Sequence, residues 1–249
     1  MKLRFQNRPY PGENSRPTPE IHVDETTNSV FVVVPWGNRE AAKKVIDRMT
    51  EYLAFAAQDR EATSPLPRLT CLSTAANNLR TAALLANDMI FREDNREEYR
   101  AGVELFAATL YQNELSWLQV GGPQLLLGRG AQSLLPLGAN IDLALDLRDW
   151  RSKHELPALP AQLLGLDANV NLTINSFRAR AGDRLLLINH SQTPEIAFSW
   201  KADQLKMDEM VRQLAKHSPR SAFWLGLLEI EASAMETQLT NTNISGDVA

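Results

Sequence analysis

The sequence predicts an α+β fold in which two mainly antiparallel sheets pack together and helices cover their outer faces. The chain reads as a strand, two helices, several hairpin strands, a helix and a final strand. Strands joined by tight turns pair antiparallel, which argues against a parallel sheet wound from βαβ units. Each early helical segment carries one apolar stripe, as a helix does when it lies on a sheet.

The first third of the chain predicts one strand and one helix. Residues 9–29 are rich in Pro, Asn, Thr and Glu and are expected to be irregular. The run Val-Phe-Val-Val-Val at 30–34 is typical of a strand buried on both faces, and the breaker cluster Pro-Trp-Gly at 35–37 should end it. A helix is then expected, because apolar residues recur at spacings of three and four: Ala42, Val45, Ile46, Met49, Leu53 and Ala56.

The middle of the chain predicts a second helix and then hairpin strands. The helix should run from about residue 70 to 91 and hold Cys71 as a small core residue. Gly121 and Gly122 can adopt the positive φ angles of a tight hairpin turn. The expected strands are 102–111, 115–120, 124–127 and 131–137.

The last third predicts a surface loop at 146–160, followed by strands and a helix. The alternating segment 169–180 indicates a half-exposed strand, and the helix is expected at about 202–217. Apolar runs predict buried strands at 184–188 and 223–230. We expect residues 1–235 to form a single domain and the polar residues 236–249 to be a disordered tail.

Composition excludes several classes of function. The chain has 249 residues, of which 44% are hydrophobic and 22% charged, and a formal net charge of −4. No basic block is present, so nucleic acid is not an expected partner. The single cysteine excludes an internal disulfide, no apolar stretch approaches the ~20 residues of a membrane span, and the first residues lack the apolar core of a signal peptide. These features predict a cytoplasmic protein.

Local motifs for common chemistries are missing. The four histidines, His22, His154, His190 and His217, do not have the spacing of a local zinc site. The sequence also lacks the glycine-flanked serine of the α/β-hydrolases and the glycine-rich loop that binds nucleotide phosphates.

Five stretches, in order along the chain, resemble the metal-dependent serine/threonine phosphatases of the protein phosphatase 2C (PPM) family. The strand 30–34 with the following helix resembles that family's strand, D-G-M-G-G-H and helix. Gly182-Asp-Arg-Leu-Leu-Leu-Ile-Asn-His resembles G-D-R-L-L-L-C-S-D and matches its first six positions. The other three stretches are 12–16 (G-x-x-N-E-D in the family), 118–129 (V-G-D-S-R-x-Y-L-x-R) and 219–223 (D-N-x-T). The resemblance implies a protein phosphatase 2C-like β-sandwich with αββα layers.

The resemblance also implies where catalytic aspartates would stand, and this chain lacks them. Members of the family use two Mg²⁺ or Mn²⁺ ions, held by carboxylates, to activate a water molecule. The family's acidic pair falls on Ser15 and Arg16, its D-G pair on Pro35 and Trp36, and its G-D-S-R aspartate on Gly122. The S-D-G aspartate falls on His190, and the last aspartate falls on Arg220 or, in a register shifted by one residue, on Ser221.

These replacements predict that the metal pair is absent and that the chain is not an enzyme but a pseudophosphatase. At ~4 Å and an effective dielectric of ~20, each lost carboxylate removes roughly 4 kcal/mol of attraction per unit of cation charge. The acidic residues Asp24, Glu25 and Glu40 are possible substitute ligands, although no motif aligns them with the lost positions.

Three functions remain open at this point. The first is a protein-interaction or regulatory module with a protein partner, because the fold is kept while its catalytic residues are lost. The second is a metal-independent phosphate or phosphopeptide binder that uses Arg16, Trp36, His190 and Arg220, which would converge in the former cleft. Alternatively, these four residues bind no ligand and only fill the former cleft and neutralise its charge. The third is a divergent phosphatase with rearranged metal ligands.

Overall fold

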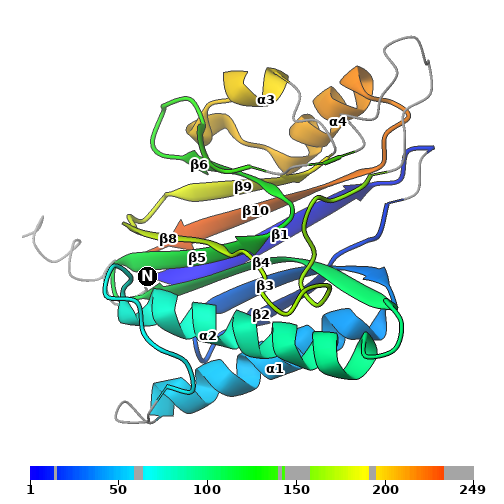
Figure 1. Ribbon diagram of the computed structural model, residues 1–249. Helices are drawn as coiled ribbons and strands as arrows, with labels where there is room; N and C mark the ends of the chain where they lie inside the picture. Colours follow the sequence, from blue (N-terminus) through cyan, green and yellow to red (C-terminus); the bar gives the residue numbers. More distant parts are fainter. Residues whose placement is uncertain (14–15, 59–63, 140–141, 144–157, 191–194, 233–249) are drawn as a thin grey trace, which may run out of the picture.

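The computed structural model describes residues 1–13, 16–58, 64–139, 142–143, 158–190 and 195–232 (Figure 1). The strands are β1 (Lys2–Tyr10), β2 (Glu20–Asp24), β3 (Ser29–Gly37), β4 (Ala101–Tyr111), β5 (Glu114–Val120), β6 (Gln124–Gly128), β7 (Leu135–Gly138), β8 (Thr173–Arg178), β9 (Arg184–Asn189) and β10 (Phe223–Glu231). The helices are α1 (Glu40–Gln58), α2 (Thr74–Met89), the π-helical η1 (Ile90–Asp94), α3 (Ile196–Ser199), the 3₁₀ turn η2 (Ala202–Gln204) and α4 (Met207–His217).

The strands form two five-stranded sheets. One sheet, the β10 sheet, has the order β1-β10-β9-β6-β7, and the other, the β4 sheet, has the order β2-β3-β4-β5-β8. Every pairing between neighbouring strands in these sheets is antiparallel. The predicted α+β class with mainly antiparallel sheets is therefore confirmed.

The two sheets and their helices make four layers (Figure 1). Alternate residues of β3 face opposite sides, so Phe31 and Val33 pack toward α1 and α2, whereas Val30 and Val32 pack between the sheets. A third core fills the space between the β10 sheet and the helices α3 and α4. The continuous apolar run at 30–34 is thus explained by burial on both faces, and the αββα arrangement is confirmed.

Several element boundaries differ from the predictions. The strand expected to stop at Pro35 continues to Gly37, with Pro35 paired to Val103 and Trp36 to Gly102. The neighbouring strand β2 reaches only as far as Val33, so Pro35 lies where β3 is paired on one side, a position that tolerates a residue without an N–H donor. Strand β2 itself lies in the segment that was predicted to be irregular.

The predicted hairpin at Gly121 and Gly122 is wrong. The two glycines link β5 to β6, which belong to different sheets, so the turn crosses the sandwich instead of pairing its flanking strands. Gly121 does have the expected positive φ of +70°. A glycine pair supplies the backbone freedom for either connection, and the packing of the two sheets decides between them.

Helix predictions were confirmed in type but not in extent. The helix α2 begins at Thr74, where the Ser73 hydroxyl accepts a hydrogen bond from Ala76 N. Cys71 therefore precedes the helix and is exposed, contrary to its predicted place in the core. The helix expected at 202–217 is divided into η2 and α4, and the short α3 was not predicted. The predicted tail and the residues 146–157 of the predicted loop lie outside the described residues.

The segment after β1 crosses the end of the sandwich and depends on Gly12. Gly12 has a φ of +53°, and a Cβ atom there would lie 2.4 Å from the backbone nitrogen of Ala222. We expect Gly12→Ala to lower the free energy of unfolding by about 2–3 kcal/mol, as measured by urea denaturation. Gly182→Ala is the matched control, because Gly182 has a φ of +89° with nothing within 4 Å of the added Cβ, and it should cost only about 1 kcal/mol. Equal effects of the two variants would contradict the close contact at Gly12.

Candidate functional site

The candidate site lies where β3 ends and β4 begins. Strand β3 carries Trp36 near its end, and the antiparallel partner β4 begins beside it with Gly102 opposite Trp36. The turn between β5 and β6 brings Gly122 to the same place, and the segment between β1 and β2 supplies Arg16. The fold therefore brings together three positions, Arg16, Trp36 and Gly122, that the motif resemblance aligned with the phosphatase motifs.

A glutamate that the sequence analysis did not select, Glu104, joins these three positions. Its side chain is fully buried, and its Oε2 accepts a hydrogen bond of 3.1 Å from the Trp36 indole Nε1. Its Oε1 accepts a hydrogen bond of 3.0 Å from the backbone N–H of Gly122 and lies 4.0 Å from Nη2 of Arg16. Glu104 is the one charged residue of β4, whose other buried residues are apolar or small, and this break in pattern is the signal that could have found it.

Arg16 is a buried cation beside Glu104. Its side chain is 6% exposed, and burial lowers the pKa of its guanidinium, while the carboxylates of Glu104 and Asp142 act in the opposite direction. Arginine nevertheless keeps its charge in proteins. At 4.0 Å and an effective dielectric of about 20, the attraction between Arg16 and Glu104 is about 4 kcal/mol.

Asp142 contributes the second negative charge that acts on Arg16. It is 4% exposed, and its Oδ1 accepts a hydrogen bond of 2.8 Å from the backbone N–H of Leu159. Nothing in the local sequence marks Asp142, because its contribution arises from the folding of a distant segment toward Arg16. Arg16 thus lies in the field of two carboxylates that come from different parts of the chain.

Arg220 occupies a different environment, at the surface. Its Nε lies 3.4 Å from Oε2 of Glu13, and both side chains are more than half exposed. The backbone N–H of Glu13 donates to the Arg220 carbonyl at 2.7 Å, so Arg220 lies beside the segment that continues toward Arg16.

His190 is buried at the end of β9. It is 6% exposed, and its ring centroid lies 5.9 Å from that of Phe223, the first residue of β10. Ser15, the other replaced acidic position, lies outside the described residues. The structure therefore joins Arg16 and Trp36 through Glu104, and it places His190 and Arg220 beside the neighbouring elements β9 and β10.

Among the described residues, those around Glu104 do not fit a pair of divalent metal ions. No group of three or more His, Cys, Asp or Glu side chains able to hold a metal occurs within the part of the chain that the structure describes. Hard cations need six or more oxygen ligands, whereas Glu104 already receives two N–H donors and faces a guanidinium.

The acidic residues considered as substitute ligands have other contacts. Asp24 accepts hydrogen bonds from Thr26 and Thr27, and Glu25 pairs with Lys2 at the surface. Glu40 is exposed at the start of α1. None of these contacts brings a carboxylate to Glu104.

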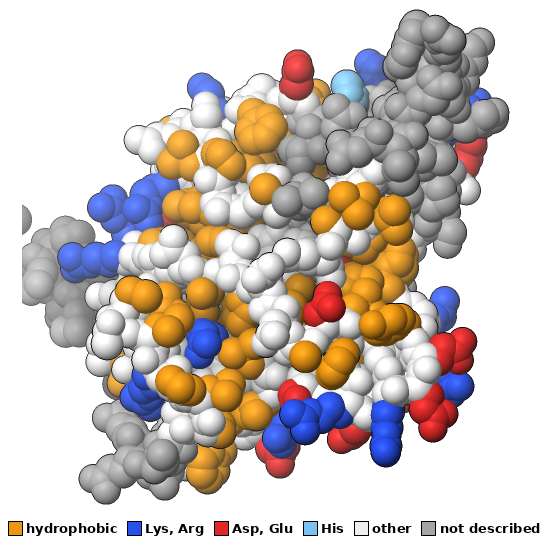
Figure 2. Space-filling view, in the orientation of Figure 1, with side chains coloured by type: hydrophobic (Ala, Val, Ile, Leu, Met, Phe, Trp, Pro, Cys, Tyr) orange, Lys and Arg blue, Asp and Glu red, His pale blue; other side chains and the backbone are white. Residues whose placement is uncertain are grey.

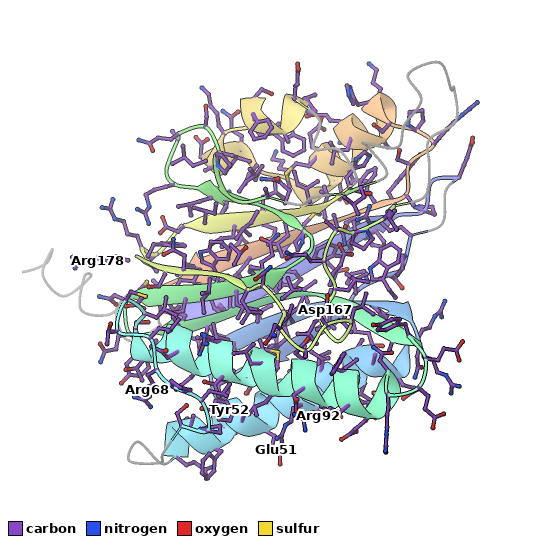
Figure 3. The ribbon with its side chains drawn as sticks, viewed as in Figure 1. Glu51, Tyr52, Arg68, Arg92, Asp167 and Arg178 are labelled. Carbon is purple, nitrogen blue, oxygen red and sulfur yellow. The ribbon has the colours of Figure 1, made fainter. Side chains whose placement is uncertain are left out.

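A groove of about 690 Å³ lies between α1 and α2, on the outer helical layer. Figure 2 shows positive and negative side chains mixed along this helical side of the molecule. Figure 3 places Glu51 and Arg92 on the same layer, where Glu51 pairs with Arg48 and Arg92 pairs with Asp88. Neighbouring charges thus neutralise one another, which is typical of a solvated helix surface.

Comparison with known proteins finds the fold but no sequence relative. The chain matches no known protein family by sequence, and it matches no curated protein. Among solved structures, it resembles the serine/threonine phosphatase PstP/Ppp of Mycobacterium tuberculosis, with a TM-score of 0.63 and 16% identity over 93% of this chain and 100% of that one.

Two further solved structures agree with this likeness. The PPM Ser-Thr phosphatase MsPP from Mycobacterium smegmatis has a TM-score of 0.63 and 17% identity, covering 93% of this chain and 100% of its own. The catalytic domain of PstP in complex with two manganese ions has a TM-score of 0.57 and 17% identity, covering 92% of this chain and 99% of its own. The chain therefore has the fold of the PPM phosphatases, and at this level of identity the likeness concerns the fold alone.

None of the described helices is long and apolar enough to cross a bilayer.

Proposed function

We propose that this chain is a catalytically inactive, PPM-like domain that acts as a protein-interaction or regulatory module. One observation supports the proposal: the buried guanidinium of Arg16 faces the buried carboxylate of Glu104. Arg16 stands at a position where the phosphatase motif has an acidic residue. A cation built into the chain opposes the binding of a second cation at the same carboxylate. Residues 1–235 would form this single domain, located in the cytoplasm, with a protein as its partner.

The absence of a metal-dependent activity can be tested directly. We expect no saturable heat when Mn²⁺ is titrated into the protein, and hydrolysis of p-nitrophenyl phosphate no faster than in a buffer blank. The PstP catalytic domain, assayed in parallel, serves as the positive control. Saturable Mn²⁺ binding together with turnover that is lost in Glu104→Gln would overturn the proposal in favour of a divergent phosphatase with rearranged ligands.

A metal-independent phosphate or phosphopeptide site remains the second candidate, although the contacts of its proposed residues oppose it. Arg16 and Trp36 are both directed at Glu104, whose negative charge would repel a phosphate. Arg220 is paired with Glu13 at the surface. A thermal melt in inorganic phosphate or a phosphoserine peptide, compared with sodium chloride at equal ionic strength, separates the candidates. Stabilisation that disappears in Arg220→Ala would support anion binding.

The protein-interaction function is tested by recovering a partner. We expect the immobilised protein to retain one partner in stoichiometric amount, and the PstP catalytic domain, which has the same fold at 17% identity, to retain none of it. Failure to recover a stoichiometric partner under conditions that preserve complexes would count against a binding module.

A further inference from the structure

The Glu104 carboxylate is held by two groups other than Arg16, namely the Trp36 indole and the Gly122 backbone, and we call this arrangement the Glu104 cradle. The Trp36 indole and the Gly122 backbone each donate a hydrogen bond to a separate oxygen of the carboxylate, at 3.1 and 3.0 Å. Because β3 and β4 are paired at this point, both donors belong to the sheet framework and the crossing turn. The carboxylate is therefore held in place whether or not a cation is beside it.

The positive charge beside Glu104 comes from Arg16, which belongs to neither sheet. Arg16 belongs to the connection between β1 and β2, and its guanidinium lies next to Oε1 of Glu104. The carboxylate of Asp142 favours the charged form of the same guanidinium. The carboxylate that lies beside this planar cation is that of Glu104, and Asp142 adds a second negative charge that acts on it.

We propose that Glu104, held by the Trp36 indole and the Gly122 backbone, forms a guanidinium-binding site that the chain fills with its own Arg16. When Arg16 is truncated, the site should accept a free guanidinium cation. This inference deepens the proposed function and rests on it, because it assigns the Glu104 carboxylate to a guanidinium and so leaves it unavailable to a metal ion.

The chemistry of the cradle favours a guanidinium over other cations. A metal ion would need oxygen ligands, but the two groups that hydrogen-bond to the Glu104 carboxylate, the Trp36 indole and the Gly122 backbone, are N–H donors. An ammonium ion is compact and strongly hydrated, and it loses more hydration on burial. A guanidinium is planar and weakly hydrated, and is therefore the cation best suited to a buried carboxylate.

The test is chemical rescue of Arg16→Ala, followed by thermal melting. We expect this variant to melt several degrees below the unmodified protein, because Glu104 loses its counter-ion. Methylguanidinium chloride at millimolar concentrations, well below denaturing levels, should raise its melting temperature in a saturable way. Methylammonium chloride and MnCl₂ at equal ionic strength should not, and the unmodified protein should not be stabilised by any of the three.

The double variant Arg16→Ala with Glu104→Gln is the matched control. It lacks the buried negative charge and should show no rise with methylguanidinium. If Arg16→Ala does not fold, Arg16→Lys keeps a positive charge but loses the planar fork, and it should melt below the unmodified protein. A variant at Arg16 that is as stable as the unmodified protein, or rescue by Mn²⁺ instead of methylguanidinium, would overturn the proposal.

Failure of this proposal can be told apart from failure of the proposed function. A protein without phosphatase activity whose Arg16→Ala variant is not rescued would contradict the guanidinium site alone. Turnover by the unmodified protein with Mn²⁺ would contradict the inactive domain, and it is measured independently of the melting temperature.

Discussion

Glu104→Ala is expected to lower the free energy of unfolding by about 3–5 kcal/mol, the range found when one partner of a buried ion pair is removed. The variant leaves the Arg16 guanidinium buried without Glu104, and it leaves the Trp36 Nε1 and Gly122 N donors without their acceptor. Buried donors that lose their partner add their own desolvation penalty. Urea denaturation followed by circular dichroism gives the change directly.

Glu98→Ala is the control for this effect. Glu98 also pairs with an arginine, Arg100, at 3.2 Å, but both side chains are more than half exposed. A surface pair of this kind contributes less than about 1 kcal/mol. Similar losses in the two variants would mean that Glu104 is solvated and that the cradle is open.

In the double variant of Arg16 and Glu104, the loss should be smaller than the sum of the single losses, because the two charges are coupled.

Asp183→Ala is expected to lower the free energy of unfolding by about 3 kcal/mol, because it removes three hydrogen bonds from a buried carboxylate. Asp183 is 2% exposed, and its two oxygens accept from Nε and Nη2 of Arg129 at 2.8 and 2.5 Å and from the backbone N–H of Arg180 at 2.9 Å. The two bonds from Arg129 connect the end of β6 to the start of β9 within the β10 sheet, and the bond from Arg180 closes the turn before β9.

Asp208→Ala is the matched control for Asp183→Ala. The Asp208 carboxylate accepts two hydrogen bonds from Arg8, at 3.1 and 2.9 Å, and its side chain is 72% exposed. This pair also has two hydrogen bonds from one guanidinium, although both go to Oδ1, and it is solvated, so its loss should cost less than about 1 kcal/mol. Thermal melts of both variants provide the comparison, and an equal shift would show that burial adds nothing to the Arg129–Asp183 pair.

Much of the fold could be predicted because its signals are local. The runs at 30–34 and 184–188 are apolar on both strand faces, and both became inner strands of their sheets. The spacing of Val45, Met49 and Leu53 predicted the buried stripe of α1. Periodicity of this kind depends on neighbouring residues, and burial of one or both faces follows from it.

The site could be predicted only in part. Motif resemblance identified Arg16, Trp36, His190 and Arg220, and the fold it implied was confirmed. It did not identify Glu104, because this glutamate stands at no position of the phosphatase motifs. A buried charge is stable only beside a partner, and the partner of Glu104 comes from a loop far away in the sequence.

The amino-acid sequence by itself determined most of the strands and helices, although not β2 or α3. It also determined the loss of the acidic motif positions, and hence the expectation that a metal centre is missing. Only the tertiary structure decided that the turn at Gly121 and Gly122 crosses between the sheets and that Arg16 lies beside Glu104, under the additional influence of the Asp142 charge. Strands and helices can be predicted because their hydrophobic periodicity involves residues only a few positions apart in the sequence. The pairing of buried charges depends on which distant segments the packed sheets bring within a few ångströms of one another.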